Sequence, residues 1–306
     1  MKVTCKTCGA KCDEKTVNGK KLYVCPYCMC EYDEDDLKPA ASSAVSGAPA
    51  APAANGELTG DQIFSKVVGS AATIRATTES VGATASGFLI SSKGFFLTNA
   101  HAVCQKDGSL YPNISVIIGD KTYKAHPVAV GEPLGSARGK AADLCLLWAE
   151  GDFSKHYINE FCNYSEVKNG QKEYIVGNPF GEGICITSGI VSDRERYLKG
   201  IDHPFLMTDA ATNAGNSGGP HYNAKAEIIG VHVAGRNASE GMNYAVPANI
   251  AQVFVSEVVK HERFRDVDFG ELNKYRTQSA QSTAVVITGI KLFLDVIAYI
   301  ISFFGK

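Results

Sequence analysis

Between residues 61 and 262 the chain repeats one local pattern, in which short apolar runs are separated by glycine and other turn residues. The runs are SGFLISS, GFFLTNAHAV, SVIIG, DLCLLW, YIVGNPFG, ICITSGIVS, AEIIGVHVAG and MNYAVP. Runs of about four to eight residues rich in Val, Ile and Phe indicate β-strands. Helical periodicity is confined to the flanks, near residues 61–70 and 248–261. This region therefore predicts a mainly β fold, either an antiparallel barrel or a pair of sandwiches.

The composition changes on both sides of this region and predicts five segments. Residues 1–36 hold six of the ten cysteines, and residues 37–60 are almost entirely Ala, Pro, Ser and Gly, which is typical of a flexible linker. The β-rich domain over 61–262 is followed by a polar connector over 263–282 and by a hydrophobic helix over 283–305.

Charge and the N-terminal sequence exclude some functions and indicate a location. The formal net charge is −2, so the chain lacks the basic field that recruits nucleic acid. The N-terminus MKVTCKTCGAKC has no apolar stretch typical of a secretory signal. Cysteines spread as pairs and singles favour metal ligands and free thiols over a disulfide framework. We therefore expect a cytoplasmic protein.

Two Cys-x2-Cys pairs near the N-terminus predict a structural zinc site. The four ligands are Cys5, Cys8, Cys25 and Cys28, with sixteen residues between the pairs. Each pair directs two thiolates at one ion, and Asn18-Gly19 midway suits a two-residue hairpin turn. Cys12 and Cys30 are surplus, and the symmetric pairing favours them as free thiols. The segment resembles zinc-ribbon domains, with Zn²⁺ in a structural role and a protein partner as the expected binding target.

The stretch ATNAGNSGGP, residues 211–220, places Ser217 among glycines. Such a stretch is often only a tight turn, and a serine hydroxyl needs an imidazole to become a nucleophile. His101 follows the apolar run GFFLTNA, where a side chain leaves the barrel and faces a cleft. Asp143 opens DLCLLW and is expected to be a largely buried carboxylate that needs a hydrogen-bonding partner.

The order His101, Asp143, Ser217 is that of the chymotrypsin-like triad, which is a worked example of general base catalysis. Over about residues 61–260 the chain resembles HtrA/Deg-type serine proteases in the order and spacing of its motifs. These motifs are LTNAHAV, ADLCLL, GNPFG with TSGIVS, TDAATNAGNSGGP, IIGV and NYAVP. The resemblance implies a chymotrypsin-like double β-barrel and a serine endopeptidase. It also implies an oxyanion hole formed by the backbone N–H groups of Gly215 and Ser217.

Two further residues predict the side chain recognised before the scissile bond. Position 211, where trypsin-like enzymes place an aspartate, is Ala211, which argues against cleavage after Lys or Arg. Thr212 and His232 resemble the pair found in glutamyl endopeptidases and picornavirus-type proteases, which favour Glu or Gln. Both side chains donate hydrogen bonds to a carbonyl or carboxylate oxygen. The simpler alternative is that His232 only packs on its strand.

The segment 283–305 contains one narrow polar stripe, with Lys291 and Asp295 spaced to pair along a helix. Three interpretations stay open: a membrane-spanning helix that oligomerises through its stripe, an interfacial helix, or a helix docked on the protein. We favour membrane attachment, with the protease on the cytoplasmic side. The alternative function for the whole chain is a catalytically silent, membrane-associated adaptor that binds proteins through the zinc ribbon and the barrel.

Overall fold

The computed structural model describes residues 13–17, 20–24, 31–33, 56–134, 142–235 and 242–277. The chain divides into two compact units, Met1–Ala51 and Pro52–Lys306.

The first unit contains a three-stranded antiparallel sheet in the order β1-β2-β3. Its strands are β1 (Asp13–Val17), β2 (Lys20–Val24) and β3 (Glu31–Asp33). Val17 pairs with Lys20, so two residues join β1 to β2, as the Asn18-Gly19 pair predicts. Asp13 pairs with Val24, which places the start of β1 beside the end of β2.

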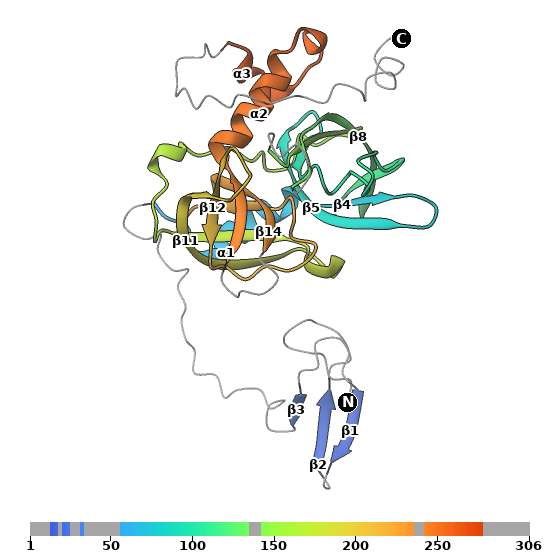
Figure 1. Ribbon diagram of the computed structural model, residues 1–306. Coiled ribbons are helices and arrows are strands. Elements are labelled where there is room, and N and C mark those ends of the chain that lie inside the picture. Colours follow the sequence, from blue (N-terminus) through green and yellow to red (C-terminus); the bar gives the residue numbers. More distant parts are fainter. Residues whose placement is uncertain are drawn as a thin grey trace. The chain divides into compact units, whose positions relative to one another are not determined.

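The second unit contains two closed antiparallel barrels of six strands, drawn in cyan to green and in yellow-green to orange (Figure 1). The first barrel has the order β4-β5-β6-β9-β8-β7, and the second has the order β10-β11-β12-β15-β14-β13. The two barrels therefore share one topology, and the predicted double barrel is confirmed. The first barrel consists of β4 (Ala71–Thr77), β5 (Gly82–Ser91), β6 (Phe95–Thr98), β7 (Asn113–Ile118), β8 (Lys121–Val130) and β9 (Cys145–Ala149).

The second barrel has the same strand order, with strands of 3 to 13 residues. It consists of β10 (Lys172–Gly177), β11 (Cys185–Tyr197), β12 (Pro204–Thr208), β13 (Pro220–Tyr222), β14 (Ile228–Gly235) and β15 (Asn243–Pro247). The strands follow the apolar runs of the sequence because each run alternates or fills a buried position; β7, for example, alternates buried with less buried residues.

Two helices flank the barrels where the sequence shows helical periodicity. Helix α1 (Gly60–Val67) begins after Thr59, whose backbone N–H donates to Gln62 Oε1 at 3.0 Å. Helix α2 (Ala248–Lys260) buries seven residues spaced three and four apart. They are Ala248, Ile250, Ala251, Phe254, Val255, Val258 and Val259. Single 3-10 turns lie at η1 (Val68–Ser70), η2 (Tyr164–Glu166) and η3 (Pro179–Gly181).

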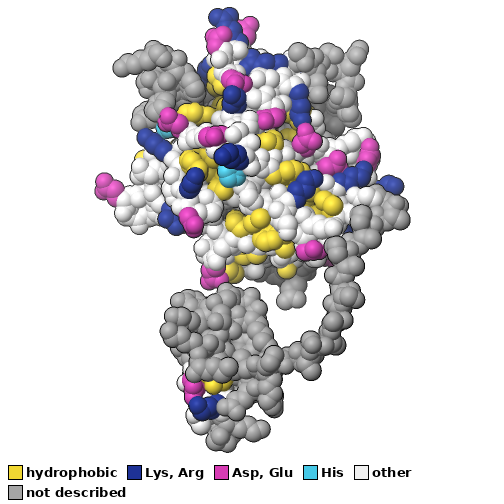
Figure 2. Space-filling view, turned by 180° about the vertical axis from the view of Figure 1, so that it is seen from behind, with side chains coloured by type: hydrophobic (Ala, Val, Ile, Leu, Met, Phe, Trp, Pro, Cys, Tyr) yellow, Lys and Arg dark blue, Asp and Glu magenta, His cyan; other side chains and the backbone are white. Residues whose placement is uncertain are grey.

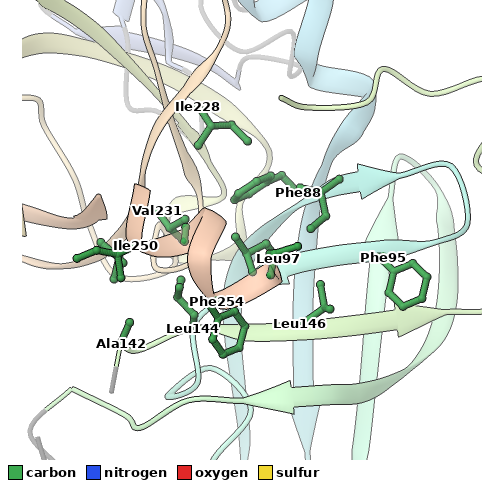
Figure 3. Packing of buried hydrophobic residues seen from close by; sticks show 14 of the residues in the cluster. Phe88, Phe95, Leu97, Ala142, Leu144, Leu146, Ile228, Val231, Ile250 and Phe254 are labelled. Carbon is green, nitrogen blue, oxygen red and sulfur yellow. The ribbon is translucent and has the colours of Figure 1, made fainter. Parts of the chain in front are cut away.

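One hydrophobic core joins the two barrels and α2 (Figure 3). Phe88 and Leu97 of the first barrel gather with Val231 of β14 and Phe254 of α2, all essentially inaccessible to water. Burial of side chains of this size contributes about 1.5–3 kcal/mol each. The relative position of the barrels is therefore set by a shared core.

Residues 262–277 form packed structure where the sequence predicts only a polar connector over 263–282. They contain η4 (Glu262–Phe264), η5 (Gly270–Asn273) and helix α3 (Lys274–Thr277). The Phe269 ring lies 4.7 Å from that of Phe95 between centroids, and its carbonyl accepts a hydrogen bond from Ser91 Oγ. This part of the segment therefore covers one side of the first barrel.

The surface of the barrels carries charges of both signs in close mixture, without a continuous basic face in the view shown (Figure 2). Within the described residues, every helix is too short or too polar to cross a bilayer. The predicted hydrophobic helix over 283–305 lies outside those residues.

Candidate active site

Strand pairing brings His101 and Asp143 together at one end of the first barrel. β6 and β9 are antiparallel neighbours, and Thr98 at the end of β6 lies opposite Cys145 at the start of β9. His101 comes three residues after Thr98, and Asp143 comes two residues before Cys145. The two side chains therefore leave adjacent strand ends.

The carboxylate of Asp143 holds His101 through two hydrogen bonds. The His101 ring Nδ1 lies 2.6 Å from Asp143 Oδ2, and the His101 backbone N–H donates to Oδ1 at 2.9 Å. Leu134 N–H also donates to Oδ2, and Asn99 Nδ2 donates to the Asp143 carbonyl. Asp143 is only 2% exposed, and His101 is 35% exposed, so a buried carboxylate orients a solvent-accessible imidazole.

Two opposing effects set the basicity of His101. Burial favours the neutral imidazole, whereas the hydrogen bond to Asp143 and its negative charge favour the imidazolium. The contributions of Asp143 prevail, so the pKa of His101 is raised above its ordinary value. An imidazole of raised pKa is a stronger base toward a hydroxyl.

The Ser217 loop requires glycine on both sides of the serine. Gly215 has φ +100°, and a Cβ there would lie 2.3 Å from the carbonyl oxygen of Asn178. Gly218 has φ +82°, and a Cβ there would lie 2.2 Å from Ser86 O and 3.1 Å from Asn99 N. The contact with Asn99 N shows that the loop lies against the end of β6, two residues before His101. The backbone bearing Ser217 thus meets the first barrel at this point.

Ser86 on β5 holds the same loop in place. Its hydroxyl donates to the carbonyl of Gly215 at 2.7 Å and accepts the backbone N–H of Asn178 at 2.8 Å. Its own N–H donates to Ser217 O at 2.7 Å. The sequence reasoning missed Ser86, which lies 129 residues from Gly215; the only signal is a serine at a buried position of the run ASGFLIS.

The carbonyls of this loop are fixed in a way that sets the direction of its N–H groups. Ala214 O accepts the N–H of Phe180, and Asn216 O accepts the N–H of Gly219. In a trans peptide the N–H points opposite to the C=O, so the N–H groups of Gly215 and Ser217 face away from those partners. Neither N–H has a hydrogen-bond partner in the part of the chain that the structure describes.

The Ser217 hydroxyl donates to the carbonyl of Val233 at 3.1 Å. Among the described residues, His101 and Ser217 share no hydrogen bond. The structure therefore joins two members of the predicted triad directly and places the third on a neighbouring loop. In free enzymes such hydrogen bonds are often long and form only with substrate.

The predicted pocket residues occupy different environments. His232 lies on β14 and is 2% exposed, while Thr212 is half-buried in the loop before Ser217. The backbone of His232 pairs with this loop, since its carbonyl accepts from Gly218 N–H and its N–H donates to Gly219 O, each at 2.8 Å. No hydrogen bond links Thr212 to His232 among the described residues. His232 is thus tied to the loop through its backbone.

The predicted zinc ligands Cys5, Cys8, Cys25 and Cys28 lie outside the described residues. Within the residues that the structure does describe, no three His, Cys, Asp or Glu side chains gather into a metal site. Four further cysteines are free thiols, as the sequence predicts for unpaired residues: Cys104, Cys145, Cys162 and Cys185.

Comparisons with known proteins show that the barrels are similar to serine peptidases. Residues 85–231 match the family described as trypsin-like peptidase domain. The chain is 35% identical over 179 residues to a probable periplasmic serine endoprotease, DegP-like, of Brucella suis, and 34% identical to that of Rhizobium meliloti. Each alignment covers 57% of this chain and 33% of the relative. The chain thus spans about a third of the length of these relatives.

Solved structures show the same fold. An HtrA-type protease, AlgW with tripeptide, has a TM-score of 0.55 and 26% identity, covering 64% of this chain and 62% of that one. The serine endoprotease from Yersinia pestis has a TM-score of 0.54 and 24% identity, covering 65% and 66%. These findings confirm the predicted similarity to HtrA/DegP-type, trypsin-like serine proteases and the chymotrypsin-like fold.

The names of the curated relatives contradict the predicted location. Both are called periplasmic. Our expectation of a cytoplasmic protein, with or without an anchor on the inner face of the membrane, is therefore wrong on this comparison. The expectation depended on the N-terminal sequence and on the spacing of the cysteines, which report on local chemistry better than on location.

Proposed function

We propose that this chain is a serine endopeptidase in which Ser217, His101 and Asp143 form the catalytic triad. The observation that carries the proposal is the 2.6 Å contact between His101 Nδ1 and Asp143 Oδ2. Next to it lies a loop with a serine and two N–H groups that have no partner among the residues described. A silent adaptor would have no need of a buried carboxylate that raises the pKa of an accessible histidine, and the comparisons do not favour it.

The reaction follows from these groups. The Ser217 hydroxyl leaves Val233 O by rotation about its Cα–Cβ bond and donates to Nε2 of His101. As the oxygen attacks the substrate carbonyl, His101 takes its proton, and Asp143 stabilises the resulting imidazolium. The imidazolium then protonates the leaving amine, and water hydrolyses the acyl-enzyme by the reverse proton transfers.

The N–H groups of Gly215 and Ser217 supply the oxyanion hole in this proposal. Neither has a hydrogen-bond partner among the described residues, and the bonds that fix Ala214 O and Asn216 O hold their direction before substrate arrives. Donors that need no reorganisation stabilise developing charge most effectively, and removal of one typically costs about 2.7–4 kcal/mol.

The proposed substrate is a protein or peptide with Glu or Gln before the cleaved bond. Thr212 and His232 would bind the side-chain oxygen of this residue. Support comes from the position of His232, whose backbone pairs with the Ser217 loop, and from the absence of an acidic residue at Ala211. Donors left unpaired in such a pocket penalise other side chains.

For the N-terminal unit we propose one structural Zn²⁺ bound by Cys5, Cys8, Cys25 and Cys28. The hairpin register supports this fit, because Asp13 pairs with Val24 and the two cysteine pairs continue from those adjacent strand ends. The ion would fold this small unit, which then serves as a docking site for a protein partner. Metal analysis of the purified protein should find one zinc ion per chain, and the Cys25→Ser variant should contain none. Zinc-free folded protein would contradict the proposal.

Labelling with a fluorophosphonate tests the nucleophile. We expect wild-type protein to be labelled at Ser217 and the Ser217→Ala variant to be unlabelled. Ser109→Ala, which alters an exposed serine of the first barrel, is the matched control and should label normally. Wild-type protein that is folded, incubated with peptide and still unlabelled would support the adaptor instead.

A peptide library tests the proposed pocket. We expect cleavage after Glu or Gln, and His232→Ala should reduce this cleavage while Ser217 remains reactive to the fluorophosphonate. A preference for Val, Ala or another small aliphatic residue would contradict the role of His232 without affecting the assignment of the triad.

A further inference from the structure

An outer groove of about 720 Å³ lies on the first barrel and contains no residue of the proposed triad. Strands β4, β7 and β8 form its floor, and β4 and β8 lie on the side of the first barrel away from β12 and β14 (Figure 1). Volumes of this size are typical of ligand-binding sites. Arg75, Lys124 and His126 are its basic side chains, and none of the described residues that line it is acidic.

Strand pairing places Arg75 and Lys124 on either side of Ser115. Arg75 on β4 lies opposite Ser115 on β7, which lies opposite Lys124 on β8. Residues directly opposite each other on paired strands project from the same face of a sheet. The Cβ atoms of the two basic residues are therefore about 10 Å apart, twice the spacing between neighbouring strands. Both side chains are exposed, and the small Ser115 between them leaves the space above the sheet open.

The positive charge on this face is not neutralised within the described part of the protein. Neither Arg75 nor Lys124 forms an ion pair there. Lys124 also acts on His126, which lies two residues further along β8 on the same face. Burial and the charge of Lys124 lower the pKa of His126, against the opposing effect of Glu150. An anionic ligand would therefore be attracted by two cations without having to displace an ion-pair partner of either.

Apolar side chains border the basic ones. Leu110, Tyr111 and Pro112 precede β7 and line the groove, with Leu110 and Tyr111 half-buried and Pro112 exposed. A free inorganic anion would leave this surface in contact with water. Surfaces that combine Arg with Tyr and other apolar side chains are typical of protein-binding sites. The groove therefore suits a peptide segment that carries acidic and apolar side chains close together.

Residues 110–112 are also connected to the turn that carries His101. Tyr111 N–H donates to Val103 O at 3.0 Å, and Val103 N–H donates to Ala100 O at 3.1 Å, which closes the turn around His101. One strand-like contact and two residues of chain thus separate Tyr111 from His101, a path of roughly 12 Å. An extended peptide covers about 3.3 Å per residue, so one substrate chain can occupy the groove and reach the proposed active site.

We propose that the outer groove is an exosite, a second substrate-binding site that holds an acidic and apolar segment of a protein substrate while another segment is cleaved at Ser217. The inference rests on the proposed function, since it takes Ser217 as the nucleophile, but binding of the segment itself does not require Ser217. Substrate carboxylates would pair with Arg75 and Lys124, and an apolar side chain between them would contact Tyr111.

Such an exosite acts on recruitment of the substrate and not on the chemical step. A substrate held in the groove is present at the active site at a raised effective concentration. The exosite contacts are the same in the ground state and in the transition state, because they lie away from the scissile bond. They therefore lower KM and leave kcat unchanged.

Binding of a short labelled peptide tests the groove directly. The probe is fluorescein-labelled Gly-Asp-Asp-Leu-Asp-Asp-Gly, which contains neither Glu nor Gln and so avoids the proposed specificity pocket. We expect saturable binding by fluorescence anisotropy at low ionic strength, and weaker binding as salt is added, because exposed charges are screened. Peptides with Asn in place of every Asp, or with Gly in place of Leu, should each bind about tenfold more weakly or worse.

Removal of the two cations should weaken this binding selectively. In the double variant Arg75→Gln, Lys124→Gln we expect the probe to bind about tenfold more weakly, since each exposed ion pair contributes modestly. The double variant Lys155→Gln, Lys168→Gln is the matched control, because both lysines are exposed, lie outside the groove and carry the same total charge. Fluorophosphonate labelling of Ser217 should be equal in wild-type protein and both variants.

A cleavage assay connects the groove with the proposed activity. A peptide that the enzyme cleaves is extended, through a flexible spacer of about eight residues, by the acidic probe sequence or by its Asn counterpart. We expect KM to be about tenfold lower for the acidic extension, with kcat unchanged. The Arg75→Gln, Lys124→Gln variant should cleave both extended peptides with the same KM, whereas the control variant should keep the difference.

The outcomes separate the exosite from the activity that it serves. Absence of saturable binding, equal weakening in the two double variants, or equal KM for both extended peptides in wild-type protein would overturn the exosite and leave the triad untouched. Equal binding of the probe without leucine would show attraction of anions in general and overturn the peptide groove. Binding as expected without labelling of Ser217 would confirm the groove as a peptide site and overturn the proposed function.

Discussion

Ser86 offers the sharpest test of how the first barrel controls the chemistry of the second. Its hydroxyl bridges two backbone groups, the carbonyl of Gly215 at 2.7 Å and the N–H of Asn178 at 2.8 Å, and it is 1% exposed. Ser86→Ala removes both hydrogen bonds but keeps the backbone bond from residue 86 to Ser217 O. The loop then stays beside β5, with the carbonyl of Gly215 and the N–H of Asn178 unpaired.

The cost follows from the two groups left unsatisfied. A buried donor or acceptor that loses its partner costs about 1–3 kcal/mol, so the pair predicts a loss of about 2–6 kcal/mol in the free energy of unfolding. The lower part of this range applies if water enters the small vacated volume. Urea denaturation measures this loss. Ser115→Ala on β7 is the control, because the Ser115 hydroxyl makes only one long contact, of 3.5 Å, with the carbonyl of Arg75. It should change the free energy of unfolding by less than about 0.5 kcal/mol.

Activity should fall in the step that forms the tetrahedral intermediate. A freed Gly215 carbonyl lets the Gly215–Asn216 peptide rotate, which disturbs the N–H groups of the proposed oxyanion hole without removing them. We therefore expect a loss smaller than that of a whole donor, about 10- to 100-fold in kcat, with KM little changed. Unchanged kcat in a variant that unfolds with the predicted loss would refute the link between Ser86 and the oxyanion hole.

Two further changes test the same site. Gly218→Ala places a methyl group 2.2 Å from a backbone carbonyl oxygen, whereas at Gly108, with a similar φ of +85°, a methyl group would have nothing within 4 Å. Only Gly218→Ala should abolish fluorophosphonate labelling and lower the melting temperature markedly. Equal effects of the two substitutions would contradict the steric argument. The acid limb of kcat/KM should lie above pH 6.5, because Asp143 raises the pKa of His101 and activity needs the neutral imidazole. Asp143→Asn should move that limb to lower pH as well as reduce kcat, and an unmoved limb would contradict the role of Asp143.

The barrels could be predicted because the sequence signal for each strand lies within a few consecutive residues. Runs such as SVIIG and MNYAVP carry their own β signal, and turn residues mark their ends. His101 and Asp143 could be placed because each sits at the end of such a run, and their order matches a known family. The strands can be recognised from neighbouring residues alone, and the two site residues from the order of the motifs along the chain.

Residues 262–277 show where local reasoning fails. Phe264, Phe269, Leu272 and Tyr275 are buried, yet they are scattered among charged residues without a helical or strand period. Their burial depends on surfaces that the first barrel and helix α2 provide, with Lys93 paired to Asp268 at 2.9 Å. No pattern within the segment reports the existence of those surfaces.

Ser86 and Glu173 could not be assigned from sequence for a related reason. A serine in ASGFLIS and a glutamate in KEYIVG are unremarkable in a strand, where either commonly faces solvent. Their contacts arise only when the barrels close, because the partners of Ser86 lie 92 and 129 residues away and His221 lies 48 residues from Glu173. Ser86 contacts Gly215, which the sequence does identify, whereas Glu173 contacts His221, which it does not.

The position of the site between the barrels makes its geometry depend on the packing of the whole domain. His101 and Asp143 belong to the first barrel and Ser217 to the second, so no single barrel holds all three. Phe88 and Val231 belong to one core that spans both barrels, and loss of packing on either side would shift one set of groups relative to the other. Displacements of about 1 Å suffice to impair such chemistry. We infer that the shared core is what keeps the His101 imidazole and the Ser217 loop in register, and that activity would be lost before either barrel unfolds.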